Sequence, residues 1–408
     1  MRDEWINCTL GDIITLQRGM DLPSQNRRNG KIPIIASNGI VGYHDEAAVK
    51  GPGVVIGRSG SIGGGQYVTC DFWPLNTTLW VKDFKGNNPL FCYYLLRSID
   101  FKTLNVGSGV PTLNRNHLHP MPSLLPPLKD QIWIANLLGS LDRRIKLLNE
   151  INTTLDSIAQ ALFKSWFIDF DPVHAKAEGR EPEGMDAETA ALFPDSFEES
   201  ELGLIPKGWR IGILADCCQK IESGGTPKRK VAEYWDGTIG WLTFGEVRNT
   251  IVYETKEKIT QVGLKESSAK IWPNGTTVVA MYGATAGEVC LLAAPIATNQ
   301  ACCGLVPKCG TKSFLFLSTR RESHNLALKS SGSAQQNLNK GLISNHKIII
   351  PPDNIINIFE GAVNHLFERW ILNDKKIKTL ANLRDLLLPR LLSGDLCLAI
   401  VENMESVL

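Results

Sequence analysis

Apolar residues recur in the middle of the chain at steps that alternate between four and three positions, the heptad pattern of a helix that buries one stripe. The pattern predicts a long helix across residues 131–166. A helix with such a stripe cannot bury it alone, so a partner is expected. The stripe consists of Ile134, Leu138, Leu141, Ile145, Leu148, Leu155, Ala159 and Leu162, with Asn152 as its polar interruption.

A second stripe with the same steps lies 225 positions later. Two such helices in one chain can bury each other, whereas either alone would be read as an ordinary core helix of an unrelated domain. The second stripe consists of Phe359, Val363, Leu366, Trp370, Ile377, Leu380 and Leu387, with Asn373 and Arg384 as polar interruptions.

The same offset of 225 residues relates other features that precede the helices. Leu113-Asn114 corresponds to Leu338-Asn339, and Pro126-Pro127 corresponds to Pro351-Pro352. Farther upstream, a Trp-Leu-Gly opening occurs twice. One register across a loop, a proline pair and a helix indicates an internal duplication. The two openings are Trp5, Leu10, Gly19 and Trp209, Leu214, Gly224.

Each half begins with a lobe, residues 1–128 and residues 209–352, in which short β-rich runs alternate with glycine-rich and asparagine-rich turns. A helical segment is expected at Leu90–Arg97. The lobes therefore read as two similar compact α+β domains with loops on one face. The expected strands include Val54–Ile56, Leu79–Val81, Val278–Ala280 and Lys347–Ile350.

The joint between the halves, residues 171–208, contains ten acidic and three basic residues together with four prolines. Proline breaks long helices, although a short one at Ala187–Leu192 fits the pattern. This composition suits either a solvated linker or a docking surface for a partner subunit.

Overall composition excludes several classes of protein. The chain has 408 residues, with 43 Lys and Arg against 42 Asp and Glu, so it is not coated with basic charge. Its ten cysteines include no Cys-x-x-Cys pair and read as reduced thiols. Because neither a signal peptide nor an apolar run of roughly 18–20 residues occurs, we expect a cytoplasmic protein without membrane spans.

The sequence contains no convincing motif for nucleotide binding, methyl transfer or metal binding. The glycines at 57, 60 and 63 fit no nucleotide-binding spacing. Asn88-Pro-Leu-Phe91 resembles the catalytic tetrapeptide of adenine methyltransferases, but a helix-initiating turn explains it better, since no cofactor loop precedes it. The seven histidines are scattered, and no metal site is expected.

The remaining candidate chemistry is polar and lies on loops. Arg and Lys neutralise phosphates, while Arg, Asn and Gln pair with base edges, so recurrence of these residues in both lobes favours nucleic-acid binding. Each residue taken singly is more often an ordinary solvated side chain. The candidates are Arg27, Arg28, Arg58, Ser59, Ser61, Asn76, Asn114 and Arg115 in the first lobe, and Lys228, Arg229, Lys230, Tyr282, Asn299, Gln335, Gln336, Asn339 and Lys340 in the second.

With these features in order, the whole chain resembles the DNA specificity subunits of type I restriction–modification enzymes. The duplicated openings, the glycine turns, the proline pairs and both helices carry the resemblance. It is strengthened by the run from Phe163 to Pro172 and by Leu386-Leu-Leu-Pro-Arg-Leu-Leu-Ser-Gly394. Single motifs are weakly specific, but the ordered set is specific.

The resemblance implies two target-recognition domains separated by two long antiparallel helices in a pseudo-twofold repeat, with no catalytic centre. The implied segments are 1–128, 129–170, 171–208, 209–352, 353–394 and a tail 395–408. It implies double-stranded DNA, two methyltransferase subunits and restriction–translocase subunits as partners. S-adenosylmethionine, ATP and Mg would be bound by those partners and not by this chain. Asn152, Asn373 and Arg384 then set the register of the helix pair or face a methyltransferase helix.

A helix of roughly 35 residues is about 50 Å long, which matches roughly 15 base pairs of DNA. The helices are thus expected to hold a fixed, unread gap between two half-sites. Two other hypotheses are kept: a stand-alone DNA methyltransferase or nuclease, and a coiled-coil scaffold that does not bind DNA.

Overall fold

The structure, a computed structural model, describes residues 4–105, 109–248, 250–330 and 337–396. The chain forms two compact units, Met1–Leu148 with Lys376–Leu408, and Asn149–Lys375. We call these unit 1 and unit 2. Each contains one globular domain and one half of each of two long helices.

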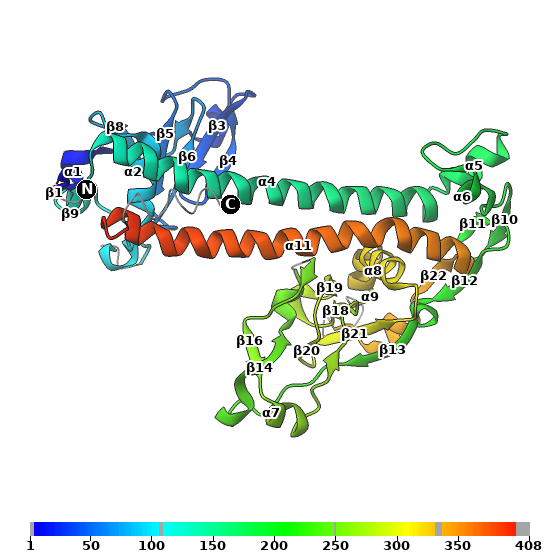
Figure 1. The fold of residues 1–408 in the computed structure, drawn as a ribbon. Coiled ribbons are helices and arrows are strands. Elements are labelled where there is room, and N and C mark those ends of the chain that lie inside the picture. Colours follow the sequence, from blue (N-terminus) through cyan, green and yellow to red (C-terminus); the bar gives the residue numbers. More distant parts are fainter. Residues whose placement is uncertain (1–3, 106–108, 249, 331–336, 397–408) are drawn as a thin grey trace. The chain divides into compact units, whose positions relative to one another are not determined.

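The long helices are α4, Leu128–Phe167, and α11, Asp353–Leu392, so the prediction of two long helices is confirmed. In unit 1 the beginning of α4 packs against the end of α11, with Ile134 and Leu391 in the same apolar cluster. In unit 2 the end of α4 packs against the beginning of α11, with Phe163 and Phe359 in contact. The helix halves therefore run antiparallel within each unit (Figure 1).

The first domain contains a four-stranded sheet of order β2-β8-β5-β6 and a three-stranded sheet of order β4-β3-β7, while β1 pairs with β9 where the domain meets α4. Helix α2 covers the larger sheet and begins at the Asn88 cap. The elements are β1 Ile6–Thr9, α1 Leu10–Ile13, β2 Thr15–Arg18, β3 Ile32–Ala36, β4 Gly39–His44, β5 Gly53–Gly57, β6 Gly63–Val68, β7 Trp73–Pro74, β8 Thr78–Asp83, α2 Pro89–Arg97, α3 Arg115–Leu118 and β9 Pro122–Leu125.

The second domain contains sheets of order β13-β21-β18-β19-β15 and β16-β14-β20-β17, and β12 pairs with β22 where the domain meets α11. The elements are β12 Arg210–Ile213, β13 Cys218–Ser223, β14 Trp235–Leu242, β15 Ile251–Val252, β16 Glu257–Ile259, α7 Gln261–Lys265, β17 Ile271–Trp272, β18 Thr277–Ala280, β19 Val289–Leu292, β20 Ile296–Thr298, β21 Cys302–Pro307, α8 Lys312–Arg321, α9 Ser323–Ser330, α10 Lys340–Ser344 and β22 Lys347–Ile350.

The two domains share one strand order, which confirms the predicted internal repeat. The central antiparallel neighbours β2-β8-β5-β6 correspond to β13-β21-β18-β19. The second sheets correspond as well, because β3 runs parallel to β7 and β14 runs parallel to β20. Strands β15 and β17 have no counterpart among the described strands of the first domain.

The acidic joint is folded, unlike a solvated linker. It forms α5 Asp171–Ala177, α6 Ala187–Ala191 and a hairpin of β10 Phe197–Ser200 with β11 Gly203–Pro206. Its apolar residues Val173 and Phe193 join the core of unit 2 through Trp166 and Trp209. All ten acidic side chains stay exposed. Apolar residues separated by prolines thus anchor a segment whose outer surface is acidic.

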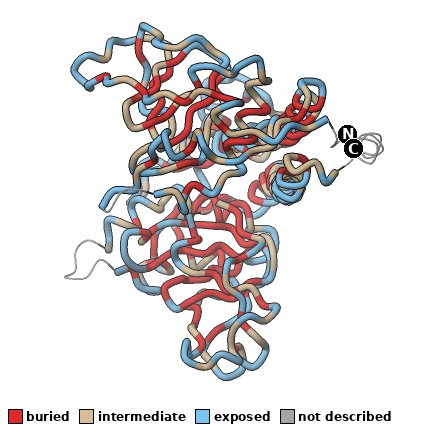
Figure 2. The backbone as a smooth tube through the Cα atoms, turned by 90° about the vertical axis from the view of Figure 1, so that its left-hand side faces the viewer, coloured by how far each residue is buried: buried red, intermediate tan, exposed pale blue. Residues whose placement is uncertain are grey.

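Buried residues gather inside each domain (Figure 2). Among the cysteines that the structure describes, six are buried, and burial raises the pKa of the Cys217 thiol to about 11. Within the described residues, no helix is both long and apolar enough to span a membrane.

Candidate nucleic-acid interface

The same backbone closure recurs at the glycine turns of both domains. In the first domain Ser59 bridges to Thr112, and Leu113 N donates to Arg58 O at 2.8 Å. In the second domain Tyr282 bridges to Asn337, and the equivalent bond from Leu338 N to Met281 O is also 2.8 Å. The predicted polar residues Ser59 and Tyr282 therefore lie at equivalent places.

The Leu-Asn pairs that follow each closure start short helices. The side chain of Asn114 accepts a 3.0 Å bond from Asn116 N at α3, and that of Asn339 accepts a 2.9 Å bond from Leu342 N at α10. Both asparagines are N-caps, which satisfies their carbonyl oxygens. Arg115 and Lys340, the next residues, are exposed. At this position each domain thus presents a cation beside a capped helix end.

The glycine turn of the first domain packs closely against the side chain of Phe101. Gly63 has φ +76°, and a Cβ there would lie 2.4 Å from Phe101 Cδ2. Gly64, with φ +72°, faces open space. Beside the turn lies a cavity of about 220 Å³, whose polar lining is Ser37, Asn38, Ser61 and Gln66. Of these four, the sequence indicated only Ser61, because the others become neighbours through the pairing of distant strands.

Several predicted cations of the first domain are engaged within the fold. Arg28 forms ion pairs with Asp45 at 2.7 Å and Glu46 at 3.1 Å, and the hydrogen bond to Arg28 lowers the pKa of Asp45. Arg27 Nε donates to the carbonyl of Leu22 at 3.3 Å. These arginines shape their own loop as well as contributing positive charge to it.

Arg58 and Asn76 lie together beside the closure. Arg58 Nη1 donates to Asn76 O at 3.4 Å, and Asn76 Nδ2 donates to Asp21 Oδ1. Both side chains are half-buried. They hold the loops around the turn and leave Ser61 as the exposed polar side chain there.

The basic loop of the second domain contains one fixed cation between two exposed ones. The guanidinium of Arg229 lies 4.0 Å from the ring centroid of Trp235 and 4.7 Å from that of Trp241. It also pairs with Glu257. Lys228 and Lys230 on either side are exposed. Cation–π contacts thus fix the loop and leave the lysines at the surface.

Asn299 differs from the expectation of an exposed loop residue. Its side chain is 7% exposed, and Oδ1 accepts a 3.1 Å bond from Ala301 N. The amide therefore stabilises a turn before β21 and does not reach the surface. Gln335 and Gln336 lie outside the described residues.

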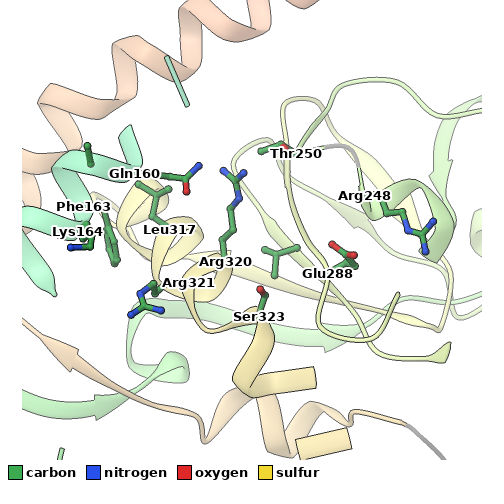
Figure 3. Close-up of a pocket in the computed structure, with 12 residues that line it drawn as sticks. Gln160, Phe163, Lys164, Arg248, Thr250, Glu288, Leu317, Arg320, Arg321 and Ser323 are labelled. Atoms are coloured by element: carbon green, nitrogen blue, oxygen red, sulfur yellow. The ribbon is translucent and has the colours of Figure 1, made fainter. Parts of the chain in front are cut away.

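A larger cavity, of about 480 Å³, lies in unit 2 between the end of α4 and the second domain (Figure 3). Arg320 lies between Arg248 and Arg321 in this view, so the three guanidinium groups do not converge on one point. Arg320 is also held by a bidentate pair with Asp156. The cavity is therefore not built as a single anion site. Within the described residues, no group of three possible metal ligands is found either.

The predicted helix-pairing residues of α4 and α11 are all buried or half-buried. Those that are buried are Ile134, Leu138, Leu141, Leu148, Phe359 and Val363. Those that are half-buried are Ile145, Leu155, Leu162, Leu366, Trp370, Ile377, Leu380 and Leu387.

The polar interruptions of the stripes face across the helix pair. In unit 2 Asn373 Nδ2 donates to Asn152 Oδ1 at 2.9 Å, and Asn152 Nδ2 donates to Asp374 Oδ1 at 2.7 Å. In unit 1 Arg384 Nη1 donates to Asp142 Oδ1 at 2.7 Å. All three polar residues thus bond to the opposite helix. This favours a role in setting the register of the helix pair over the alternative of facing a methyltransferase helix.

Comparison with known proteins agrees with this architecture. The family model of the type I restriction modification DNA specificity domain matches residues 2–157 and 206–364. The type I restriction enzyme HindI specificity subunit of Haemophilus influenzae is 33% identical over 315 residues, covering 67% of this chain and 68% of that protein. The MjaIX specificity subunit of Methanocaldococcus jannaschii is 27% identical over 314 residues, covering 75% and 68% respectively.

Among solved structures, the S subunit of the type I restriction–modification system from M. genitalium has the same fold. It superposes with a TM-score of 0.64 at 15% identity, covering 95% of this chain and 96% of that one. Two matches to the family model, one over each domain, together with a relative that is 33% identical over two thirds of its length, establish the relationship. The chain belongs to the type I restriction–modification DNA specificity family.

Proposed function

We propose that this chain is the DNA-recognition subunit of a type I restriction–modification complex, in which each domain reads one half of a split target. The observation that carries the proposal is the shared closure, Leu113 to Arg58 and Leu338 to Met281, beside exposed polar residues in each domain. Equivalent frames with different side chains suit the reading of two different half-sites. The target is therefore asymmetric.

The two domains share the backbone closure but carry different side chains beside it. After the asparagine cap the first domain continues with Arg115, and the second continues with Lys340 and Gly341. The exposed Lys228 and Lys230 belong to the second domain, while Arg28 of the first is paired with two carboxylates. Arg can pair bidentately with guanine, whereas Lys acts as a point charge toward phosphate.

Two methyltransferase subunits are the partners that the helices suit. Leu147 on α4 is 56% exposed, and Leu372 on α11, at the equivalent position 225 residues later, is 53% exposed. The same exposed apolar side chain at equivalent positions of the two helices suits two copies of one partner subunit. Those subunits would bind S-adenosylmethionine and transfer the methyl group, and restriction–translocase subunits would use ATP and Mg. The assembly would work on DNA in the cytoplasm.

DNA affinity of the chain alone is expected to be weak. The net charge is +1, so few phosphates are neutralised without partner surfaces. A salt-titrated binding assay with and without methyltransferase subunits tests this point. Equal affinity in both arms would refute it.

The test of the function is genome-wide mapping of methylated adenines in cells with and without this gene. We expect one bipartite, asymmetric motif to lose methylation when the gene is removed. An unchanged methylation pattern would favour a scaffold outside DNA recognition. Binding of S-adenosylmethionine by the purified chain would favour a stand-alone methyltransferase.

A further inference from the structure

Equivalent helices of the two domains have an arginine in their last turn that reaches a long helix. Helix α2 begins with Phe91 in its first turn and ends at Arg97, and α8 has Phe314 and Arg320 at matching places. Both phenylalanines are buried in the core of their unit. Each helix is thus fixed at its beginning by apolar packing and at its end by a charged contact.

The contact in unit 2 is a bidentate ion pair. Arg320 Nη1 and Nη2 donate to the two carboxylate oxygens of Asp156 on α4 at 2.6 and 2.9 Å. The side chains are 27% and 16% exposed. A planar guanidinium on a carboxylate constrains direction as well as distance.

The contact in unit 1 gathers three donors on Asp142 of α4. Tyr94 Oη donates at 2.7 Å, Arg384 of α11 donates at 2.7 Å, and Arg97 Nη1 lies 3.6 Å away. Burial, reinforced by this carboxylate, raises the pKa of the Tyr94 hydroxyl, so the tyrosine remains a proton donor. One carboxylate therefore joins the first domain to both long helices.

These contacts are not copies made by the duplication. The position equivalent to Asp142 is Phe367, and the position equivalent to Asp156 is Ala381. Both carboxylates lie on α4, although α2 and α8 belong to different repeats. Two unrelated positions of α4 thus each place a carboxylate near one of the two equivalent arginines, Arg97 and Arg320.

We propose that Asp142 and Asp156 are positioning residues, each of which fixes the angle at which one recognition domain is held against α4. The inference rests on the proposed function, because the angle matters only if the domains read DNA. Apolar packing around Phe91 and Phe314 is non-directional and keeps each domain attached. The hydrogen-bonded carboxylates supply direction, so their loss loosens orientation before it loosens the fold.

The test compares Asp142→Asn with Asp156→Asn in the complex assembled with methyltransferase subunits. Each variant is the matched control for the other, since both remove one charge from the same helix. Methylation rates are measured on duplexes with the mapped target, with the gap changed by one base pair, and with either half-site altered. Half-sites are first assigned to domains from loop variants such as Lys340→Ala.

The measured quantity is the methylation rate on DNA altered in one half-site, divided by the rate on the intact target. For the half-site read by the variant's own domain, we expect this ratio to be about three- to tenfold higher in each variant than in the wild type. Tolerance of the altered gap should rise in both variants. The other half-site should be read as strictly as before. Tyr94→Phe, which removes a single bond to Asp142, should give a weaker form of the Asp142→Asn result.

Rescue separates positioning from stability. Arg320→Asp combined with Asp156→Arg restores an ion pair with reversed charges and should restore discrimination at the second half-site. Relaxation of both half-sites by either variant, or an even loss of methylation on all duplexes, would overturn the proposal. Failure of the wild-type complex to prefer the mapped target would instead refute the proposed function.

Discussion

Asn373 Nδ2 donates a 2.9 Å hydrogen bond to Asn152 Oδ1 between the antiparallel helix halves of unit 2. Asn373 is 0% exposed, and its own Oδ1 has no hydrogen-bond partner within the described residues. The positions related to this pair by the 225-residue offset are Leu148 and Ile377. The positions that hold a polar pair in unit 2 are thus occupied by two apolar residues in unit 1, which distinguishes the two halves of the duplicated helix pattern.

The asparagine pair is expected to cost stability when it is broken on one side only. Asn152→Ala leaves the buried amide of Asn373 unpaired and should lower the free energy of unfolding by about 1–3 kcal/mol. The double variant Asn152→Ile with Asn373→Leu, which adopts the apolar pair of the other repeat, should recover most of this loss. Urea unfolding of the full chain measures both. A double variant as unstable as the single one would contradict the account.

The helices and the repeat could be predicted because their signals are periodic and local. The four-and-three steps locate α4 and α11, and the constant offset indicates an internal duplication, whereas the shared strand order is seen only in the structure. The start of α2 at Asn88-Pro89 was also readable, since an asparagine cap followed by proline is a local signal.

The interface could be predicted only in outline. Asn114 and Asn339 carry the signature of N-caps as well as that of base contacts, and sequence alone does not separate the two. Asn299 has the sequence context of a loop residue, yet Asn299 and Ala301, which its side chain binds, are both buried. Likewise, the acidic joint folds because Phe193 meets Trp166 and Trp209, contacts between distant positions.

The two central glycines of the first glycine turn should differ in their tolerance of alanine. Gly64→Ala places a Cβ in open space and pays only for its positive φ, about 1 kcal/mol. Gly63→Ala has a similar φ and also drives the Cβ against the Phe101 ring, adding about 1–3 kcal/mol. Thermal unfolding of the two variants compares them directly. Equal destabilisation would show that the contact with Phe101 does not shape the turn.

Lys228 and Lys230 are expected to contact DNA phosphates. The double substitution to alanine should weaken binding evenly across sequences and reduce the slope of log affinity against log salt by about 2, or roughly 0.9 per phosphate. The control is Lys207→Ala, an exposed lysine outside the recognition domains. DNA binding by the assembled complex is titrated with salt. An unchanged slope, or a change in the sequence preferred, would argue against phosphate contacts.

Acid should destabilise the second domain through Glu322. Its carboxylate accepts a 3.0 Å bond from His346, and this bond lowers the pKa of Glu322 below the usual 4.5. A lowered carboxyl pKa stabilises the fold above about pH 4.5, and this contribution disappears as the pH falls through the folded-state value. Glu322→Gln should therefore cost about 1 kcal/mol at pH 7 and progressively less as the pH falls through the folded-state pKa of Glu322.

Unfolding midpoints of the wild type and Glu322→Gln, measured from pH 7 to pH 3, check this expectation. The difference between the two proteins should close as the pH falls, because the protonated glutamic acid and glutamine are then alike. A difference that stays constant with pH would mean that the charge on Glu322 contributes nothing.

The most direct test is to lengthen both long helices and determine which DNA sequence the complex then methylates. Inserting four residues into each of α4 and α11, at equivalent positions near their middles, adds about 6 Å to each helix, close to two base pairs of DNA. Mapping of methylated adenines should show both half-sites unchanged and the gap between them longer by about two base pairs. An unchanged gap, or a change in the bases of either half-site, would contradict two reading domains spaced by paired helices.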